Sequence, residues 1–401
     1  MKNWKTRFVL LSVGQAVSML TSSILQISIV WYLTRQTGSA AVVTTSTLSG
    51  YLPRAILGMF TGVFIDRYDR KKILILSDLS IAFAALALAA VALWTQIPVW
   101  LIFLMLCIRS VGAAFHTPSF NAVVPTIVPK DQLARCAGIT QSFESVSLIL
   151  SPALAGVLFI VWDLSAIIFL DVIGALIAIL IVWFLPIPKH EERADAPTLH
   201  VWQDMKEGVA VLRSEKGLMS IMVISTLYAF IYFPIGSLFP LITMTYFGGS
   251  VADSSMVEIV FSSGTLLGAL LLGWMGNRIH KVRAIAASIG LYGVGTMLSG
   301  LLPPQGLRLF VVLSGIMGLT IPFYYGLRTA IFQSRIPDRY LGRVFSFSYS
   351  ITLLAAPLGL VMGGTVSELA GVNHCFFLCG ILAIGLSTAM LILPSVRNSG
   401  V

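Results

Sequence analysis

The sequence predicts an all-α integral membrane protein with twelve transmembrane helices, arranged as two six-helix bundles related by pseudo-twofold symmetry. Of its 401 residues, 57% are hydrophobic and only 11% are charged, whereas soluble proteins carry about 25% charged residues. Three observations carry the prediction: twelve long apolar runs, an uneven distribution of Lys and Arg between successive loops, and a pattern that recurs in the two halves of the chain.

The apolar runs are long enough to cross a bilayer, since a membrane helix needs about 20 mostly apolar residues. They cover residues 7–33, 41–65, 73–95, 98–124, 137–161, 164–187, 218–246, 254–277, 284–302, 307–333, 344–367 and 373–394. We therefore expect an N-terminal six-helix bundle over residues 1–187, a cytoplasmic linker over 188–217 and a C-terminal six-helix bundle over 218–401.

The basic residues predict the orientation, because cytoplasmic loops of membrane proteins carry an excess of Lys and Arg. With the N-terminus in the cytoplasm, 22 of the 26 basic residues fall in inner segments, whereas the outer loops hold only Arg35 and Arg308. The remaining two, Arg54 and Arg109, fall inside predicted spans. We expect a multi-pass protein of the cell membrane with both termini in the cytoplasm.

Several classes of function are not expected. The net charge is +9, but no basic stripe lies on a water-soluble face, so a nucleic-acid partner is not expected. The cysteines lie in or beside apolar runs without metal-ligand or disulfide spacing. The sequence contains no phosphate-binding loop and no nucleophile beside a base. We expect no enzyme, no cofactor, no metal and a monomer, and association with a separate ATPase subunit stays open.

The two halves repeat each other. "GVFIDR" (62–67) matches "GWMGNR" (273–278), and "VPKDQLAR" (128–135) matches "IPDRYLGR" (336–343), at offsets of 211 and 208 residues. Both pairs close helices at the predicted cytoplasmic side. Transporters built from parallel repeats place their substrate site between the halves near the bilayer midplane, so we expect the site there.

The loop between the second and third spans resembles the signature loop of the major facilitator superfamily, through Gly62, Asp66, Arg67, Arg70 and Lys71. The resemblance implies the major facilitator fold. We predict that this loop, with Asn277 and Arg278 at the equivalent place in the second half, forms a gating motif that holds the cytoplasmic helix ends together. The alternative is that the basic residues only set the topology.

Further stretches point to one branch of that superfamily. Arg109-x-x-Gly112 and "SPALAG" (151–156) are similar to motifs of drug:proton antiporters. The stretches "GQAVSMLTSSILQ", "RSVGAAFHTPSFNAV", "LARCAGITQS" and "GVNHCFFL" resemble the macrolide efflux (Mef) transporters. The resemblance implies export of hydrophobic drugs of the macrolide type, driven by a proton gradient. Alternatives are an exporter of an endogenous siderophore or lipid-like metabolite, and a receptor or partner subunit that does not transport.

Five ionisable residues fall inside spans of the first half, where each costs about 2.5–3.5 kcal/mol to insert. They are Arg54, Asp78, Arg109, Glu144 and Asp171. We predict that Glu144, Arg109, Arg54 and Asp171 couple transport to protons, with Glu144 paired to Arg109 or Arg54. A substrate contact or a static ion pair remains an alternative for Glu144. Static pairing is favoured for Asp171, and for Asp78 with the basic loop beside it.

Polar and aromatic residues are candidates for the substrate site. Gln15, Ser18, Ser22 and Gln26 recur at spacings of 3, 4 and 4 on one face of the first span, and lipid does not satisfy such a polar stripe. The candidate substrate contacts are Gln15, Ser22, Gln26, His116, Tyr228, Tyr232 and Phe323. Hydrogen bonds between helices are the alternative for the polar residues, and ordinary packing is the alternative for the aromatic ones.

Overall fold

The structure, a computed structural model, describes residues 4–129, 132–187, 209–210, 212–213, 216–275, 279–336 and 338–393. The described part of the chain is built from helices and short connections, without a strand. Its twelve α-helices are α1 (Trp4–Thr37), α2 (Ala40–Arg67), α3 (Arg70–Ala92), α4 (Val99–Ile127), α5 (Leu133–Val161), α6 (Leu164–Phe184), α8 (Lys216–Leu241), α9 (Val251–Met275), α10 (Lys281–Leu301), α11 (Leu307–Arg335), α12 (Asp338–Ala370) and α13 (Val372–Ile392). The predicted all-α fold with twelve long helices is confirmed.

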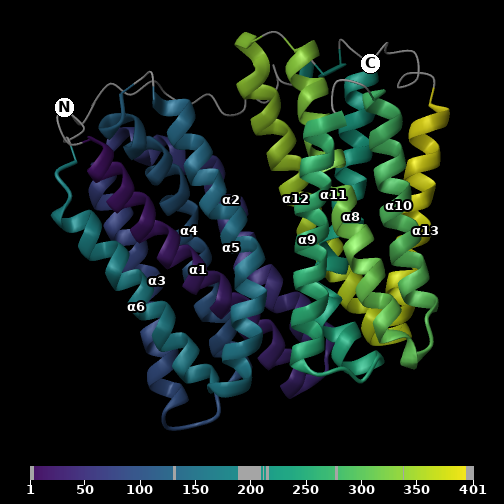
Figure 1. The fold of residues 1–401 in the computed structure, drawn as a ribbon, viewed down its shortest axis with the longest axis horizontal. Coiled ribbons are helices and arrows are strands. Elements are labelled where there is room, and N and C mark those ends of the chain that lie inside the picture. Colours follow the sequence, from purple (N-terminus) through teal and green to yellow (C-terminus); the bar gives the residue numbers. More distant parts are fainter. Residues whose placement is uncertain are drawn as a thin grey trace. The chain divides into compact units, whose positions relative to one another are not determined.

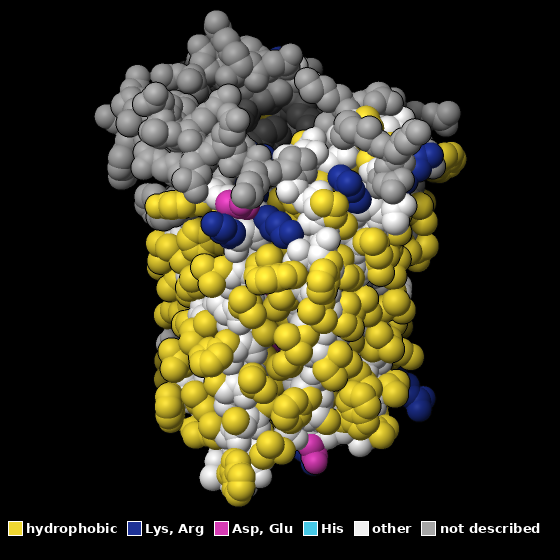
Figure 2. Space-filling view, turned by 90° about the vertical axis from the view of Figure 1, so that its left-hand side faces the viewer, with side chains coloured by type: hydrophobic (Ala, Val, Ile, Leu, Met, Phe, Trp, Pro, Cys, Tyr) yellow, Lys and Arg dark blue, Asp and Glu magenta, His cyan; other side chains and the backbone are white. Residues whose placement is uncertain are grey.

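The outer surfaces of these helices are apolar. Nine helices within the described residues are long and apolar enough to cross a membrane, and α5 and α12 add shorter apolar stretches over Ile149–Val161 and Leu354–Ala370. Large hydrophobic side chains such as Phe83 and Trp274 are more than 70% exposed. Figure 2 shows one face on which hydrophobic side chains form a broad belt. An apolar surface this continuous is stable in lipid and not in water.

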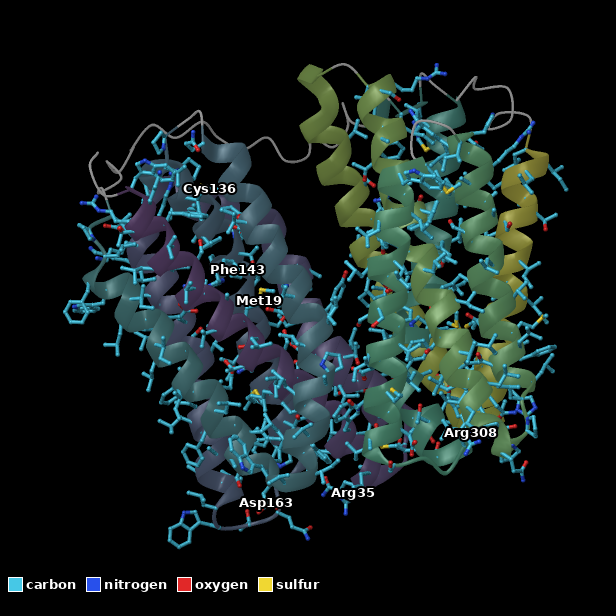
Figure 3. The ribbon with its side chains drawn as sticks, in the orientation of Figure 1. Met19, Arg35, Cys136, Phe143, Asp163 and Arg308 are labelled. Carbon is cyan, nitrogen blue, oxygen red and sulfur yellow. The ribbon has the colours of Figure 1, made fainter. Side chains whose placement is uncertain are left out.

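The chain divides into two compact units (Figure 1). The first comprises Met1–Leu33 and Ser46–Leu199, and the second comprises Thr34–Thr45 and His200–Val401. Arg35 and Arg308, the two basic residues predicted for outer loops, both belong to the second unit. Figure 3 shows them at the same end of that unit.

The first unit has an apolar core at one end of its helices. Leu11, Leu74, Phe120, Val123, Ile127, Val182 and Leu185 form this buried cluster. These residues come from α1, α3, α4 and the end of α6, and α3 packs along both α4 and α6. The cluster therefore joins four of the six helices of this half of the chain, from α1 to α6.

Helix α3 begins three residues earlier than its predicted span, at Arg70, because Asp69 caps it. The Asp69 carboxylate accepts hydrogen bonds from the backbone N–H groups of Lys71 (2.8 Å) and Lys72 (3.2 Å). A side-chain acceptor at this position satisfies N–H groups that have no partner within the helix. Part of the charged loop is thus a helix start signal.

The second unit is held together by close helix contacts. Helix α10 packs on α13, and α9 packs on α11. A Cβ atom on Gly268 of α9 would lie 2.2 Å from the carbonyl oxygen of Leu319 on α11. Small residues of this kind let helix backbones approach closely where lipid supplies no hydrophobic driving force. Helix α8 continues into the π-helix Ile242–Tyr246 (η2), and α11 follows the short 3₁₀ turn Pro304–Gly306 (η3).

Candidate functional site

Polar residues in the first unit lie one helical turn beyond its apolar core. Gln15 follows Leu11 by four residues on α1, Asp78 follows Leu74 by four on α3, and His116 precedes Phe120 by four on α4. Residues four apart lie on the same helix face, about one turn or 5.4 Å along the axis. The interior of the first unit is thus lined by apolar side chains at one level and by polar and ionisable side chains one helical turn further along.

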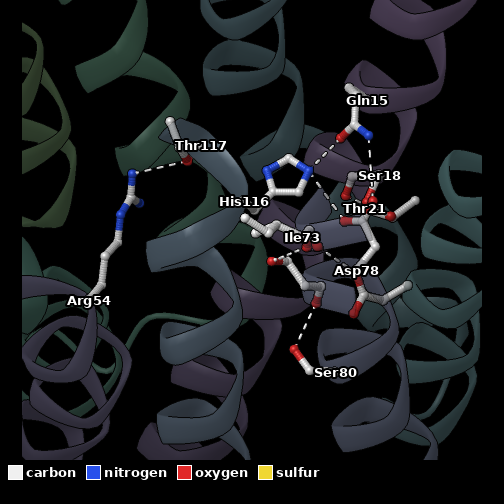
Figure 4. Close-up of polar contacts among 12 residues, drawn as sticks. Gln15, Ser18, Thr21, Arg54, Ile73, Asp78, Ser80, His116 and Thr117 are labelled. Carbon is white, nitrogen blue, oxygen red and sulfur yellow. Dashed lines mark hydrogen bonds and ion pairs between the residues drawn. The ribbon is translucent and has the colours of Figure 1, made fainter. Parts of the chain in front are cut away.

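Gln15, Asp78 and His116 form one hydrogen-bonded cluster, which we call the His116 cluster (Figure 4). The His116 Nε2 atom lies 2.7 Å from Gln15 Oε1 and 3.3 Å from Asp78 Oδ1. Gln15 Nε2 donates to Asp78 Oδ2 at 3.5 Å. Asp78 is 2% exposed, whereas the His116 side chain is 22% exposed. The imidazole is therefore the member of the cluster that reaches the surface of the unit.

The close approach of α3 and α4 brings Asp78 to His116. A Cβ atom on Gly112 would lie 2.8 Å from both Ile81 Cγ1 and Ser80 Oγ on α3, so only a glycine fits there without a shift. On α3, Asp78 belongs to the buried stripe of that helix together with Leu74, Ser77 and Ala82. Its carboxyl group therefore faces the interior of the unit.

A second buried pair joins α4 to α6. Arg109 Nη1 donates to Asp171 Oδ2, and Ser22 Oγ on α1 donates to Asp171 Oδ1 at 2.7 Å. Asp171 is 0% exposed and Arg109 is 8% exposed. A buried carboxylate needs this combination of a counter-charge and further hydrogen bonds. The pair lies two helical turns from the His116 cluster, since Arg109 precedes His116 by seven residues.

Arg54 lies on the exposed side of the same region. Its side chain is exposed, and its Nη2 atom donates to Thr117 Oγ1 at 3.4 Å. The backbone N–H of Arg54, which follows Pro53, donates to Ser110 Oγ at 2.9 Å. Ser110 and Thr117 were not among the predicted site residues, because a hydroxyl group on an apolar helix carries no distinctive sequence signal.

Some predicted pairings take a different form in the structure. The side chain of Glu144 lies outside the described residues, and the partner of Arg109 is Asp171. The expectation that Asp78 pairs with the basic loop is wrong, because Asp78 faces Gln15 and His116 instead. Arg70 and Lys71 of that loop lie about two turns away on the same helix, and both donate to backbone carbonyl oxygens.

The polar stripe on α1 takes part in hydrogen bonds between helices. Gln15 contacts Asp78 and His116, and Ser22 contacts Asp171. Ser18 is buried, and Gln26 is half-buried near Gly50 of α2. Gln15 and Ser22 therefore supply neutral hydrogen-bonding groups to the two acidic residues Asp78 and Asp171, which is the alternative that the sequence left open for the polar stripe.

Two residues of the predicted gating motif tie helix ends together within the first unit. Lys71 Nζ donates to the carbonyl oxygens of Trp183 and Leu185, both at 2.8 Å, at the C-terminal end of α6. Arg70 Nη1 donates to the carbonyl oxygen of Ala122 on α4 at 2.9 Å. Cations are favourable at such carbonyl-rich helix ends. The side chains of Gly62, Asp66 and Arg67, and residues Asn277 and Arg278, lie outside the described residues.

Two of the aromatic candidates, Tyr228 and Tyr232, belong to a tyrosine cluster in the second unit. The Tyr228 ring centroid lies 4.5 Å from that of Tyr324 and 5.7 Å from that of Tyr292, and Tyr232 lies 5.6 Å from Tyr292. Tyr228 is fully buried, whereas Tyr232 and Phe323 are half-buried. In this structure Tyr228 packs inside the unit, and Tyr232 and Phe323 keep part of their surface accessible.

No group of three His, Cys, Asp or Glu side chains that could hold a metal ion occurs in the described ranges. The site consists instead of a few buried charges and hydrogen-bonding groups, carried by long apolar helices. Ionisable groups buried between membrane helices are typical of transport proteins. The fold and these groups define a multi-pass membrane transporter.

The chain belongs to the Major Facilitator Superfamily, whose sequence profile matches residues 11–250 and again residues 221–400. It is 48% identical to macrolide efflux protein A of Streptococcus pyogenes over 396 residues, which span 99% of this chain and 98% of that relative. It is 50% identical to macrolide efflux protein A of Enterococcus faecalis over 323 residues, which span 80% of this chain and 100% of that relative. The family expected from the signature loop is confirmed.

Solved structures agree on the fold. A point variant of the nucleoside transporter NupG superposes with a TM-score of 0.78 at 12% identity, over 96% of this chain and 99% of that protein. A likeness at this identity shows the fold alone. As a member of this superfamily, the chain is a transporter of small molecules and not an enzyme.

Proposed function

We propose that this chain exports hydrophobic drugs, with macrolide antibiotics as substrates, across the cell membrane in exchange for protons. The observation that carries the substrate is the near full-length similarity to macrolide efflux protein A of Streptococcus pyogenes. The sequence resembles that relative over 396 residues, which include the helices that carry the buried polar groups. The orientation that the basic residues predict, with both termini in the cytoplasm, belongs to this proposal.

Proton coupling is supported by the ionisable residues of the first unit. Arg109 and Asp171 are buried and paired, and Asp78 is buried beside His116. Buried charges are costly and destabilise a bundle unless they are paired, so a structural protein gains little from two such sites. In a transporter, by contrast, such groups can bind a proton from one side of the membrane and release it to the other when the side from which water reaches the site changes.

The aromatic residues of the second unit are proposed to contact the drug. Tyr232 and Phe323 keep accessible surface beside the buried tyrosines, and large adaptable aromatic surfaces suit substrates that vary in shape. In the first unit, Gln15, Ser22 and Gln26 supply hydrogen-bonding groups. The gating motif is proposed to stabilise the cytoplasmic ends, and Lys71 already ties α3 to the end of α6.

The direct test is accumulation of labelled erythromycin in cells with and without the chain, each with and without a protonophore. We expect lower accumulation in cells that contain the chain, and we expect the protonophore to abolish the difference. Equal accumulation in both cell lines would contradict macrolide export. Export that survives collapse of the proton gradient and requires ATP would indicate a separate ATPase subunit instead of antiport.

A Glu144→Gln variant tests the predicted proton carrier in the same assay. We expect the variant to reach the membrane in normal amounts and to export less drug under a proton gradient, because a neutral amide takes up no proton. Membrane abundance, measured by immunoblot, separates impaired coupling from impaired folding. Gradient-driven export at the wild-type level would remove Glu144 from the mechanism.

A second candidate function is export of an anionic endogenous metabolite. The observation in its favour is Arg54, whose exposed guanidinium is hydrogen-bonded to the hydroxyl of Thr117. Such a group suits a carboxylate or phosphate on the cargo. This function would be favoured over drug export if cells with and without the chain accumulated erythromycin equally, and if mass spectrometry of the medium detected an anionic metabolite that only cells with the chain release.

A further inference from the structure

We propose that Asp78 and His116 form the proton-exchange site of the transporter, and that their proton leaves when a cationic drug binds. This inference rests on the proposed drug:proton antiport and names the residues that carry its proton. It assigns an exchange role to two residues that the sequence analysis treated as a static pair and a substrate contact.

The two buried carboxyl groups among the described residues of the first unit, Asp78 and Asp171, have different partners. Asp171 faces Arg109, and an arginine guanidinium keeps its proton under all physiological conditions. The Asp171 charge is therefore permanently matched. Asp78 faces an imidazole and an amide, and neither of these groups is a permanent cation. Of these two carboxyl groups, Asp78 is therefore the one that lacks a permanent counter-charge.

The other groups around Asp78 do not supply a permanent counter-charge either. Among the titratable groups of the helices packed against it, His116 on α4 and Asp171 on α6 act electrostatically on Asp78. Asp171 is held by Arg109, and α1 contributes the neutral Gln15. With one proton shared between them, Asp78 and His116 are neutral as a pair. Without it, the pair carries one negative charge in a buried place.

The exposure of the two side chains and the position of the apolar core indicate the path by which a proton reaches Asp78. The His116 side chain is 22% exposed and the Asp78 side chain is 3% exposed, so the imidazole connects the buried carboxyl group to the surface of the unit. On the other side, the apolar layer of Leu11, Leu74 and Phe120 lies one helical turn away. Protons therefore reach Asp78 through His116 and not along the core of the bundle.

Charge balance couples the proton to the drug. Loss of the proton leaves one negative charge, and a buried unpaired charge is strongly unfavourable. A cationic drug near His116 supplies the missing positive charge, so its binding favours proton release to the side from which the drug came. When the drug leaves on the other side, the pair takes up a proton there. One cation moves out for each proton that moves in, and no bond other than the one to the proton is broken.

The test uses the full chain reconstituted in lipid vesicles with labelled erythromycin. One assay measures accumulation against an imposed pH step. The other measures exchange of labelled for unlabelled drug without a pH step. For the wild type, a step of one pH unit should drive about tenfold accumulation for each proton exchanged. Asp78→Asn should lose the accumulation, because a neutral amide takes up no proton. His116→Gln should reduce it, because the imidazole that shares the proton with Asp78 is gone.

Ser80→Ala is the matched control on α3, since the Ser80 hydroxyl donates to the carbonyl oxygen of Ser77 on its own helix, at 2.7 Å. It should behave as the wild type in both assays. Accumulation at the wild-type level by Asp78→Asn would overturn the inference while leaving drug export intact. Failure of the wild type to exchange erythromycin would instead contradict the proposed function.

Proton release gives a second readout that a structural role would not affect. Erythromycin added to the purified wild-type protein in weak buffer with a pH-sensitive dye should release protons, and His116→Gln should release fewer, because the imidazole that shares the proton with Asp78 is gone. If a thermal scan shows that Asp78→Asn is not folded, the comparison of proton release between the wild type and His116→Gln tests the inference instead. Release by His116→Gln equal to the wild type would overturn the inference.

Discussion

Replacement of Asp171 by asparagine is expected to destabilise the protein more than any other single change in the first unit. Asp171 is fully buried and neutralises Arg109. Removal of one partner of a buried ion pair costs about 3–5 kcal/mol, because the other charge stays buried without compensation. The measurement is thermal unfolding of the purified protein in detergent, together with its abundance in the membrane.

Two further variants show whether the cost comes from the lost charge. Ser22→Ala removes a single hydrogen bond to Asp171 and should cost about 1 kcal/mol. An Arg109→Met, Asp171→Leu double variant removes both charges and should recover much of the stability, since apolar replacement of a buried pair is often neutral. An Asp171→Asn protein as stable as the wild type would show that the pair is not closed in solution.

The second large effect is expected at the contact between α9 and α11. Gly268→Leu places a side chain where a Cβ atom would lie 2.2 Å from the Leu319 carbonyl oxygen. Backbone cannot move aside as a flexible side chain can, so the two helices must separate. We expect a loss of about 3 kcal/mol or more, at the upper end of the cost of overpacking, measured by thermal unfolding.

The matched control is Gly273→Leu on the same helix. A Cβ atom at Gly273 meets nothing within 4 Å, and the residue is exposed. Both variants make the same chemical change within one helix, so helix propensity cancels between them. Equal stability of the two variants would mean that α9 and α11 do not pack as closely as the structure has them.

The sequence predicted the helices well because length and hydropathy decide them locally. Each of the twelve apolar runs corresponds to one long helix, and the differences lie at the ends. The third span was expected from residue 73, but α3 begins at Arg70 under the Asp69 cap. Hydropathy excludes the charged residues of the first turn, whereas the backbone begins its hydrogen bonds at the cap.

The residues of the site could be found from the sequence, but not all of their partners. Ionisable residues inside apolar runs identified Arg109, Asp171 and Asp78 one by one. Their pairing depends on how α1, α3, α4 and α6 pack, and sequence spacing does not contain that information. For Asp78 a usable signal existed, since it falls in one stripe with Leu74, Ser77 and Ala82, which points it inward and away from the basic loop.

The central claim is that ionisable groups buried in the first unit exchange protons for drug. The most direct measurement is the proton flux that accompanies drug flux, recorded together in vesicles that contain the purified chain and a pH-sensitive dye. The account predicts that a drug gradient imposed alone drives protons in the opposite direction, and that this movement stops in Asp78→Asn. Drug flux at the wild-type rate with no accompanying proton movement would contradict it.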